Sequence, residues 1–212
     1  MILFLDTVSP LPEFSIIEED KIIYTKKIIL NNNEKMSDSI IQCYLSLEKK
    51  FSLNSKLTLL VTNTGPGSYT ALRVGIAFLS GLALGKKINL IGITCLDLYN
   101  YQIAKNKLNL SAFFIASSNN QQFICIYDSL KLNYSIIKID KQYSFDIGKF
   151  LSLKNIYTND ILALNNTNIF NNISKKEIRF DEIVLNNLSI IRNLPRKEII
   201  NPIYISDNKI LN

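Results

Sequence analysis

Residues 57–93 read LTLLVTNTGPGSYTALRVGIAFLSGLALGKKINLIGI, and this stretch decides the fold class. Its apolar runs predict one strand over 57–62 and another over 89–93. Between them, Gly65-Pro66-Gly67-Ser68 predicts a turn, and the segment 69–85 predicts a helix. This alternation of strands with a helix is typical of an α/β fold.

Three further strands are predicted before this stretch, joined by polar turns. They are expected at 2–5, 14–18 and 22–29. Their succession predicts a meander. Ser37 or Asp38 is expected to cap a helix that runs to about Lys50, and a short helix over 96–104 closes this part of the chain.

The same pattern restarts after residue 111. Further strands are expected at 112–116, 123–127 and 135–139, an apolar segment at 161–164, a helix at 181–192, a strand-like tail at 203–206 and an Asn-rich surface loop at 165–174. We infer an internal duplication of a strand-strand-strand-helix unit. The duplication divides the chain into a first half, 1–104, and a diverged second half, 105–212.

The glycine turn follows a strand and opens a helix. Its backbone N–H groups and the positive end of the helix dipole can therefore meet an anion. Gly65, Gly67 and Ser68, together with Asp6, are candidate contacts of an anion or nucleotide. The turn lacks the Gly-Lys-Ser/Thr of a P-loop. The alternative is structural, in which the glycines permit a positive φ, Pro66 stiffens the turn and Ser68 caps the helix.

The helix predicted over 69–85 is apolar on nearly all sides. One face can pack on its own sheet, while the other is rich in small residues and lets a second helix approach closely. That second helix is either the helix predicted from Met36 to Lys50 or a helix of a partner protein. The candidate partner-interface residues lie on both helices: Ile40, Cys43, Tyr44, Leu47, Val74, Ala77, Phe78 and Gly81.

The residue types present argue against several kinds of site. The 212 residues contain no histidine, and the three cysteines, Cys43, Cys95 and Cys125, form no CxxC pair. A transition-metal site would need carboxylates alone, and the commonest general base is missing. We therefore predict no metal site, no cofactor and no catalytic residue. Unpaired, dispersed cysteines fit a reducing compartment such as the cytoplasm.

The net charge of +6 favours contact with a polyanion such as tRNA. The lysines are scattered along the sequence, however, and a bias toward Asn, Ile and Lys also follows from a base composition rich in A and T. The longest apolar stretch, 69–93, is interrupted by Arg73 and two lysines, so no membrane span is predicted. The first residues show no signal for export.

The string GPGSYTALRVG at 65–75 closely resembles GPGSFTGLRIG, the signature of the TsaB (YeaZ) family. The opening LFLDT at 3–7 resembles that family's LALDTS, and PIYI at 202–205 resembles its closing PxYLR. Order and spacing match over the whole chain, and the resemblance is strongest over about the first hundred residues.

The resemblance implies a fold of the actin, Hsp70 and sugar-kinase (ASKHA) superfamily, with two related halves that each contain a mixed sheet and packed helices. It also implies a non-catalytic subunit that pairs with the catalytic TsaD and the ATPase TsaE. That complex transfers a threonylcarbamoyl group to the adenosine beside the anticodon of tRNAs that read codons starting with A. A homodimer through the same helices is implied too, with tRNA reached through the complex.

Some residues depart from the family patterns. TsaD-type subunits hold a metal through an HxxxH pair, which this chain lacks. Ser117-Ser118-Asn119 stands where relatives carry Asp-Ala-Arg, and Ser206 stands where an arginine is usual. The missing aspartate removes a magnesium ligand. The alternative function, a stand-alone ATPase or small-molecule kinase that uses Asp6 and the Gly65–Ser68 turn, is weakened accordingly.

Overall fold

The computed structural model describes residues 1–30, 34–106, 110–128, 133–139, 153, 155–167, 170, 173–195, 199–206 and 209–211. Within these ranges only the backbone is described at 103–106, 110, 119, 127–128, 133–135, 206 and 209–211.

The first half is built on a five-stranded mixed sheet in the order β3-β2-β1-β4-β5. Its strands are β1 (Ile2–Asp6), β2 (Glu13–Glu18), β3 (Lys21–Lys27), β4 (Leu59–Asn63) and β5 (Asn89–Ile93). The central strand β1 pairs antiparallel with β2 and parallel with β4. Every residue of β1 and β4 is buried, because both faces of the sheet are covered. The predicted meander and the strands on either side of the glycine turn are confirmed.

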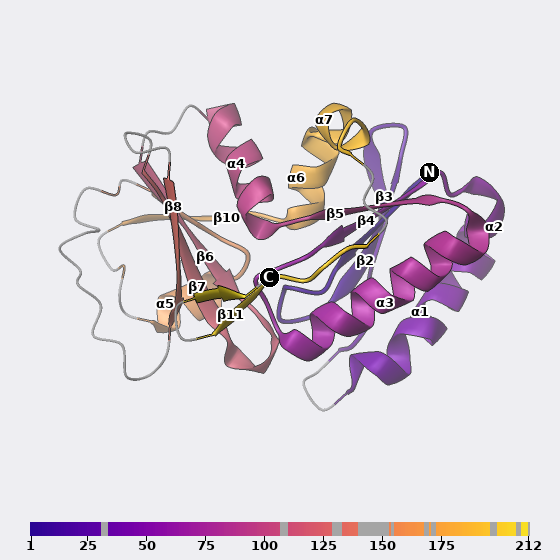
Figure 1. Cartoon of the computed structure of the whole chain (residues 1–212), viewed down its shortest axis with the longest axis horizontal. Coiled ribbons are helices and arrows are strands. Elements are labelled where there is room, and N and C mark those ends of the chain that lie inside the picture. Colours follow the sequence, from indigo (N-terminus) through magenta and orange to yellow (C-terminus); the bar gives the residue numbers. More distant parts are fainter. Residues whose placement is uncertain are drawn as a thin grey trace.

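Two helices cover one face of this sheet and lie side by side in Figure 1. They are α1 (Met36–Phe51) and α3 (Tyr69–Lys86), and the shorter α2 (Leu53–Lys56) and α4 (Cys95–Asn106) follow α1 and β5. The core beneath α1 and α3 includes Leu3, Leu5 and Leu79. α3 approaches β1 so closely that a Cβ atom at Gly75 would overlap Thr7 Cγ2. Glycine is therefore required at this helical position.

The second half repeats the strand order of the first in a sheet β10-β9-β6-β7-β8. Its elements are β6 (Leu110–Ala116), the 3-10 turn η1 (Ser118–Asn120), β7 (Gln122–Asp128), β8 (Asn133–Ile139), β9 (Asn155–Thr158), α5 (Ile161–Asn166) and β10 (Ser174–Glu177). β6 pairs antiparallel with β7 and parallel with β9, as β1 does with β2 and β4. The inferred duplication is thus confirmed for the strands. No residue range was predicted for the helix of this repeat, and residues 140–152, which follow β8, lie outside the described residues.

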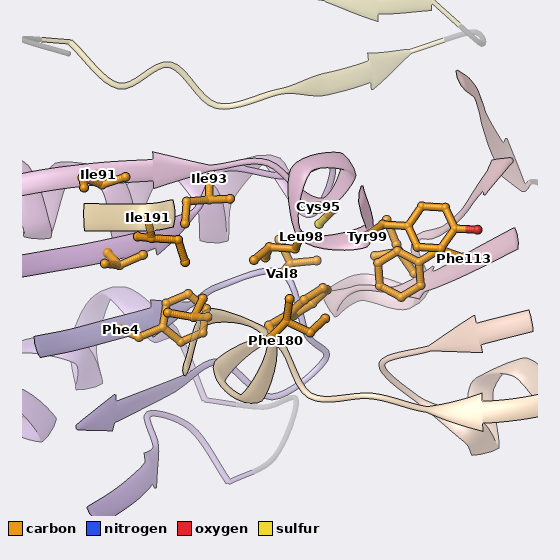
Figure 2. Close-up of a cluster of buried hydrophobic side chains, with 14 of the residues drawn as sticks. Phe4, Val8, Ile91, Ile93, Cys95, Leu98, Tyr99, Phe113, Phe180 and Ile191 are labelled. Atoms are coloured by element: carbon orange, nitrogen blue, oxygen red, sulfur yellow. The ribbon is translucent and has the colours of Figure 1, made fainter. Parts of the chain in front are cut away.

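The last elements return to the first half. They are α6 (Phe180–Asn186), α7 (Leu188–Arg192), β11 (Tyr204–Ser206) and β12 (Lys209–Leu211). α6 contacts β1, β3 and α4. A core cluster between the halves therefore joins Phe4 and Val8 to Phe113 and Phe180, as Figure 2 shows. The large apolar area buried there holds the two sheets together.

Several local predictions were wrong. The helix expected at 181–192 is two helices, separated at Asn187. α1 begins at Met36 as predicted, but its N-cap residue is Lys35, and neither Ser37 nor Asp38 caps it. The two instead bond to each other, Ser37 Oγ donating to Asp38 Oδ1 at 2.9 Å. The apolar segment 161–164 is the start of α5, and β10 begins at Ser174, where the loop was expected to end.

Candidate functional site

The glycine turn lies buried between β4 and α3. Gly65 has φ +107°, and a Cβ atom there would lie 2.7 Å from the Ile203 carbonyl oxygen. The Gly65 amide donates to Asn63 Oδ1 at 3.1 Å, and its carbonyl accepts from the Cys95 amide at 2.8 Å. The positive φ predicted for both glycines is confirmed at Gly65 and was wrong at Gly67. The close approach of residue 203 to Gly65 was not predicted.

Gly67 and Ser68 connect the two halves. The Ser68 amide donates to Ser117 Oγ at 2.9 Å. A Cβ atom at Gly67 would lie 3.3 Å from both Ser117 Oγ and Val8 Cγ2. Ser117, in the turn that departs from the family pattern, therefore takes one of the amides that the anion hypothesis needed. Ser68 is the N-cap residue of α3, but its side chain makes no cap bond, so that part of the prediction was wrong.

Arg73 lies exposed on α3, stacked on two tyrosines. Its guanidinium carbon lies 3.8 Å from the centre of the Tyr69 ring, and its Nε donates to the Tyr204 hydroxyl at 3.1 Å. The two tyrosine rings are 4.6 Å apart. Cation–π contacts of this kind fasten the C-terminal segment to the start of α3. The sequence analysis missed this role, although the motif arginine and the tyrosine of the closing motif were the available signal.

Asp6 ends β1 and is buried. Its Oδ1 accepts the Val8 amide at 2.8 Å and the Ser9 amide at 3.3 Å, which fixes the turn after the strand. Burial raises the pKa of Asp6 from 3.8 to about 6, and the hydrogen bonds from Ser9 and Val8 oppose that rise. The carboxylate has a structural task in this turn.

Asp6 lines a cleft of about 530 Å³ between the two halves. Charged residues from both halves line it: Asp6, Glu13, Lys27, Asp160, Glu177, Arg179 and Glu182. Burial, followed by the charge of Asp6, raises the pKa of Glu13 from 4.5 to about 7. Carboxylates outnumber cations on these walls, so the cleft repels polyphosphates.

Arg179 and Asp181 form a polar network beside the cleft that the sequence analysis missed. Arg179 donates to both carboxylate oxygens of Asp181, at 3.0 Å and 2.6 Å. Asp181 is buried and also accepts the hydroxyl of Ser15 at 2.9 Å. The hydrogen bonds that Arg179 donates to Asp181 raise the pKa of Arg179 above its ordinary value. Because Ser15 lies in β2, this network attaches α6 to the first sheet.

Two of the four candidate anion contacts line different cavities. Asp6 lines the inter-half cleft, and Ser68 lines a separate cavity at the start of α1 and α3. Gly65 and Gly67 are buried under Ile203, Val8 and Ser117. In the part of the chain that the structure describes, no group of three or more His, Cys, Asp or Glu is placed to hold a metal ion.

The predicted partner-interface residues divide by helix. The four on α1, Ile40, Cys43, Tyr44 and Leu47, are buried in the chain's own core. Val74 and Phe78 on α3 are half-buried against the same core, whereas Ala77 and Gly81 are exposed. The four α1 residues therefore pack within the chain, as the intramolecular alternative predicted. On α1 the large apolar residues that a partner could reach are Ile41 and Leu45, exposed by 54% and 50%.

The described helices include none that is both long and apolar enough to cross a membrane.

Comparisons with known proteins place this geometry in a family. The model of the family TsaD, tRNA N6-adenosine threonylcarbamoyltransferase, matches residues 32–185. The tRNA threonylcarbamoyladenosine biosynthesis protein TsaB of Buchnera aphidicola subsp. Schizaphis graminum (strain Sg) is 32% identical over 81 residues, which are 36% of this chain and 39% of that protein. The match thus spans about two fifths of the relative's length.

Two solved structures share the fold over nearly the whole chain. A Pseudomonas aeruginosa protein described as similar to peptidase YEAZ has a TM-score of 0.64 at 12% identity, covering 97% of this chain and 99% of that one. YeaZ from Pseudomonas aeruginosa has a TM-score of 0.61 at 12% identity, covering 96% and 99%. The predicted ASKHA-type fold is confirmed by these likenesses and by the repeated sheet. The chain belongs to the family of the threonylcarbamoyltransferase model, and the Buchnera relative and the two YeaZ-like folds support its resemblance to the TsaB (YeaZ) type.

Proposed function

We propose that this chain is a non-catalytic accessory subunit in the biosynthesis of tRNA threonylcarbamoyladenosine, and that it binds a TsaD-type catalytic subunit through the exposed face of α1 and α3. The observation that carries the proposal is a stripe of small and apolar residues that nothing in the described chain covers. The family match and the name of the Buchnera relative supply the pathway.

The stripe follows the helical period along α3. Ala77, Gly81 and Leu84 are exposed at spacings of four and three residues, which place them on one face. Leu84 is 83% exposed, and no atom lies within 4 Å of a Cβ built at Gly81. On α1, which contacts α3, Ile41 and Leu45 are also exposed. Small residues allow a partner helix to pack close to the backbone, and large apolar residues beside them supply buried area.

The accessory role is supported by the residue types in the sequence and by the separation of the candidate site residues. The sequence has no histidine, and Asp6 and Ser68 lie in separate cavities rather than around one ligand. In this proposal the TsaD-type partner supplies the catalytic groups. TsaE and tRNA join through the complex, which works in the cytoplasm, and a homodimer uses the same stripe when the partner is absent. We also propose that the halves divide near residue 104, with α6 docked back onto the first sheet.

Gly81→Arg tests the interface. An arginine there fills the open space with a charged side chain, so we expect the affinity for a TsaD-type subunit to fall ~30-fold or more. The measurement is calorimetric titration of the two purified proteins. Leu162→Arg is the matched control, because Leu162 is 72% exposed on α5, in the other half. Equal affinities for both variants would mean that α3 is not the interface.

Reconstitution tests the accessory role. Threonylcarbamoylation of tRNA is measured with a TsaD-type subunit, a TsaE-type ATPase and a source of threonylcarbamoyl-adenylate, with and without this chain. We expect product only when the chain is present, and none from the chain alone. Equal product without it would contradict the proposal.

A further inference from the structure

The exposed face of α3 carries a single charged side chain, that of Arg73. Residues 69–85 contain no other charged residue. Arg73 is exposed and precedes Ala77, Gly81 and Leu84 by four, eight and eleven residues, which are helical spacings that place all of them on one face. Its guanidinium therefore lies at the N-terminal end of the small and apolar stripe described above.

Two tyrosines hold this guanidinium in one orientation. Its central carbon lies 3.8 Å from the centre of the Tyr69 ring, and Arg73 Nε donates to the Tyr204 hydroxyl at 3.1 Å. The centres of the two tyrosine rings are 4.6 Å apart. A side chain that is already ordered loses little conformational entropy when a partner binds it. The contact is long-range, because Tyr204 follows Arg73 by 131 residues.

The positive charge of Arg73 is not balanced within the described chain. The ion pairs of the described residues join Arg179 to the carboxylates of the cleft and of α6, and none includes Arg73. A guanidinium has five N–H donors, of which the Tyr204 hydroxyl takes the one on Nε. The two Nη atoms point the remaining donors in a fork that matches the two oxygens of a carboxylate. An acidic group from outside the chain is therefore the expected partner.

The surroundings of Arg73 favour a protein partner over tRNA. Binding to a nucleic-acid backbone usually relies on several cations, since each one neutralises one phosphate. The exposed face of α3 offers one cation beside small and apolar residues. Arginine and tyrosine are also among the residues that most often dominate the binding energy of protein interfaces.

We propose that Arg73 pairs with an acidic side chain of the TsaD-type catalytic subunit. In this inference Tyr69 and Tyr204 are positioning residues, which hold the guanidinium ready for that carboxylate. The C-terminal segment thereby becomes part of the interface through Tyr204. The inference rests on the proposed function, because it assigns the chemistry at one end of the same α3 surface.

Calorimetric titration of a purified TsaD-type subunit with variants at Arg73 tests the pairing. Arg73→Gln should weaken binding ~10-fold and Arg73→Glu ~100-fold, because the glutamate repels the partner's carboxylate. Arg73→Lys should lie between wild type and Arg73→Gln, since lysine keeps the charge and lacks the fork. Added salt should reduce the difference between wild type and Arg73→Gln.

Arg192→Gln is the matched control for the loss of an exposed arginine. Arg192 ends α7, which lies on the other side of the first sheet from α3 (Figure 1). It should bind the TsaD-type subunit as wild type does. Equal affinities for Arg73→Gln, Arg73→Glu and Arg192→Gln would overturn the proposal.

Tyr204→Phe separates positioning from a merely structural role. The substitution removes the hydroxyl that fixes Nε and keeps the ring against Tyr69, so binding should weaken ~3-fold. In a double-mutant cycle it should have no further effect once Arg73 is glutamine. Equal weakening in both backgrounds would show that the hydroxyl does not act through Arg73.

Gly81→Arg shows which of the two proposals has failed. If it weakens binding while the Arg73 variants bind like Arg192→Gln, the α3 interface stands and the pairing of Arg73 is overturned. If Gly81→Arg binds as wild type, the proposed interface itself is wrong. Arg73 variants that weaken only self-association, or only tRNA binding by the assembled complex, would assign Arg73 to a second copy of this chain or to RNA, and would likewise overturn the pairing.

Discussion

The two halves start their corresponding helices in different ways. In the second half, α5 begins after β9 with Asp160, whose Oδ1 accepts the Ala163 amide at 2.9 Å. In the first half, α3 begins after β4 with Ser68, whose side chain caps nothing. A carboxylate at the N-cap satisfies both a free amide and the dipole. The duplicated sheets share their strand order, so the difference shows that the segments after β4 and β9 diverged while the strand order did not.

The same contrast holds for how each helix meets its sheet. α3 runs for 18 residues and touches the end of β1 at Gly75, whereas α5 has 6 residues. A long helix pressed onto a strand needs a glycine at the crossing, and a short helix at the edge of a turn does not. The first half is thus the more constrained one.

The largest effect should come from Gly75→Val. Its side chain would overlap Thr7 and lie against Leu5, and overpacking on this scale costs ~3 kcal/mol or more of unfolding free energy. Denaturant titration measures the loss. Gly81→Ala is the control, because its Cβ meets open space and alanine favours a helix, so it should match or exceed wild type. Wild-type stability in Gly75→Val would show that α3 does not press on β1.

A smaller effect is expected from substitutions at the N-caps of α5 and α3, which compare the two helix starts directly. Asp160→Ala removes the cap of α5 and should cost ~1 kcal/mol of unfolding free energy. Ser68→Ala removes a hydroxyl that caps nothing and should change it by less than ~0.5 kcal/mol. Thermal and denaturant unfolding of both variants measures the difference. Equal losses would mean that the two starts are equivalent in solution.

A separate effect, on the pH dependence of stability, concerns the two carboxylates that the first half contributes to the cleft. The pKa of Glu13 is raised from 4.5 to about 7 and that of Asp6 from 3.8 to about 6. Between the lower and upper values the folded protein holds more protons than the unfolded chain, so the unfolding free energy falls as pH rises through this window. In Glu13→Gln the fall between pH 4.5 and about 7 should be shallower. An unchanged slope would contradict the burial of Glu13.

Much of the fold followed from local patterns. The apolar runs at Ile2–Asp6 and Asn89–Ile93 and the apolar periodicity of α3 each stand out from polar flanks, so their positions were predictable. β9 and β10 were both missed. β10 consists of Ser-Lys-Lys-Glu and carries no apolar signal. Its strand pairing with β9 is a property of the assembled sheet.

The candidate site was predictable only in part. The glycine turn and its positive φ followed from residue types, since Gly65 is the kind of residue that such backbone requires. The sequence could not show whether Asp6 and Ser68 lie in one site. Both come at or after the end of a strand, but the cavity that each lines is formed by segments distant in the chain. The burial of Tyr44 and Leu47 likewise depends on which face of α1 packs on the sheet.

The sequence by itself determined the α/β class, the repeated meander, the glycine motif that marks the TsaB (YeaZ) type and the absence of histidine. Only the tertiary structure decided that Ser117 and Ile203 cover the glycine turn and that α6 docks onto the first sheet. It also decided that α3 begins beside a cavity, without a side-chain cap. The physical reason is the distance along the chain. Propensity, periodicity and turn chemistry act between near neighbours, whereas these contacts join residues 49 to 166 positions apart, and they form only when the whole core packs.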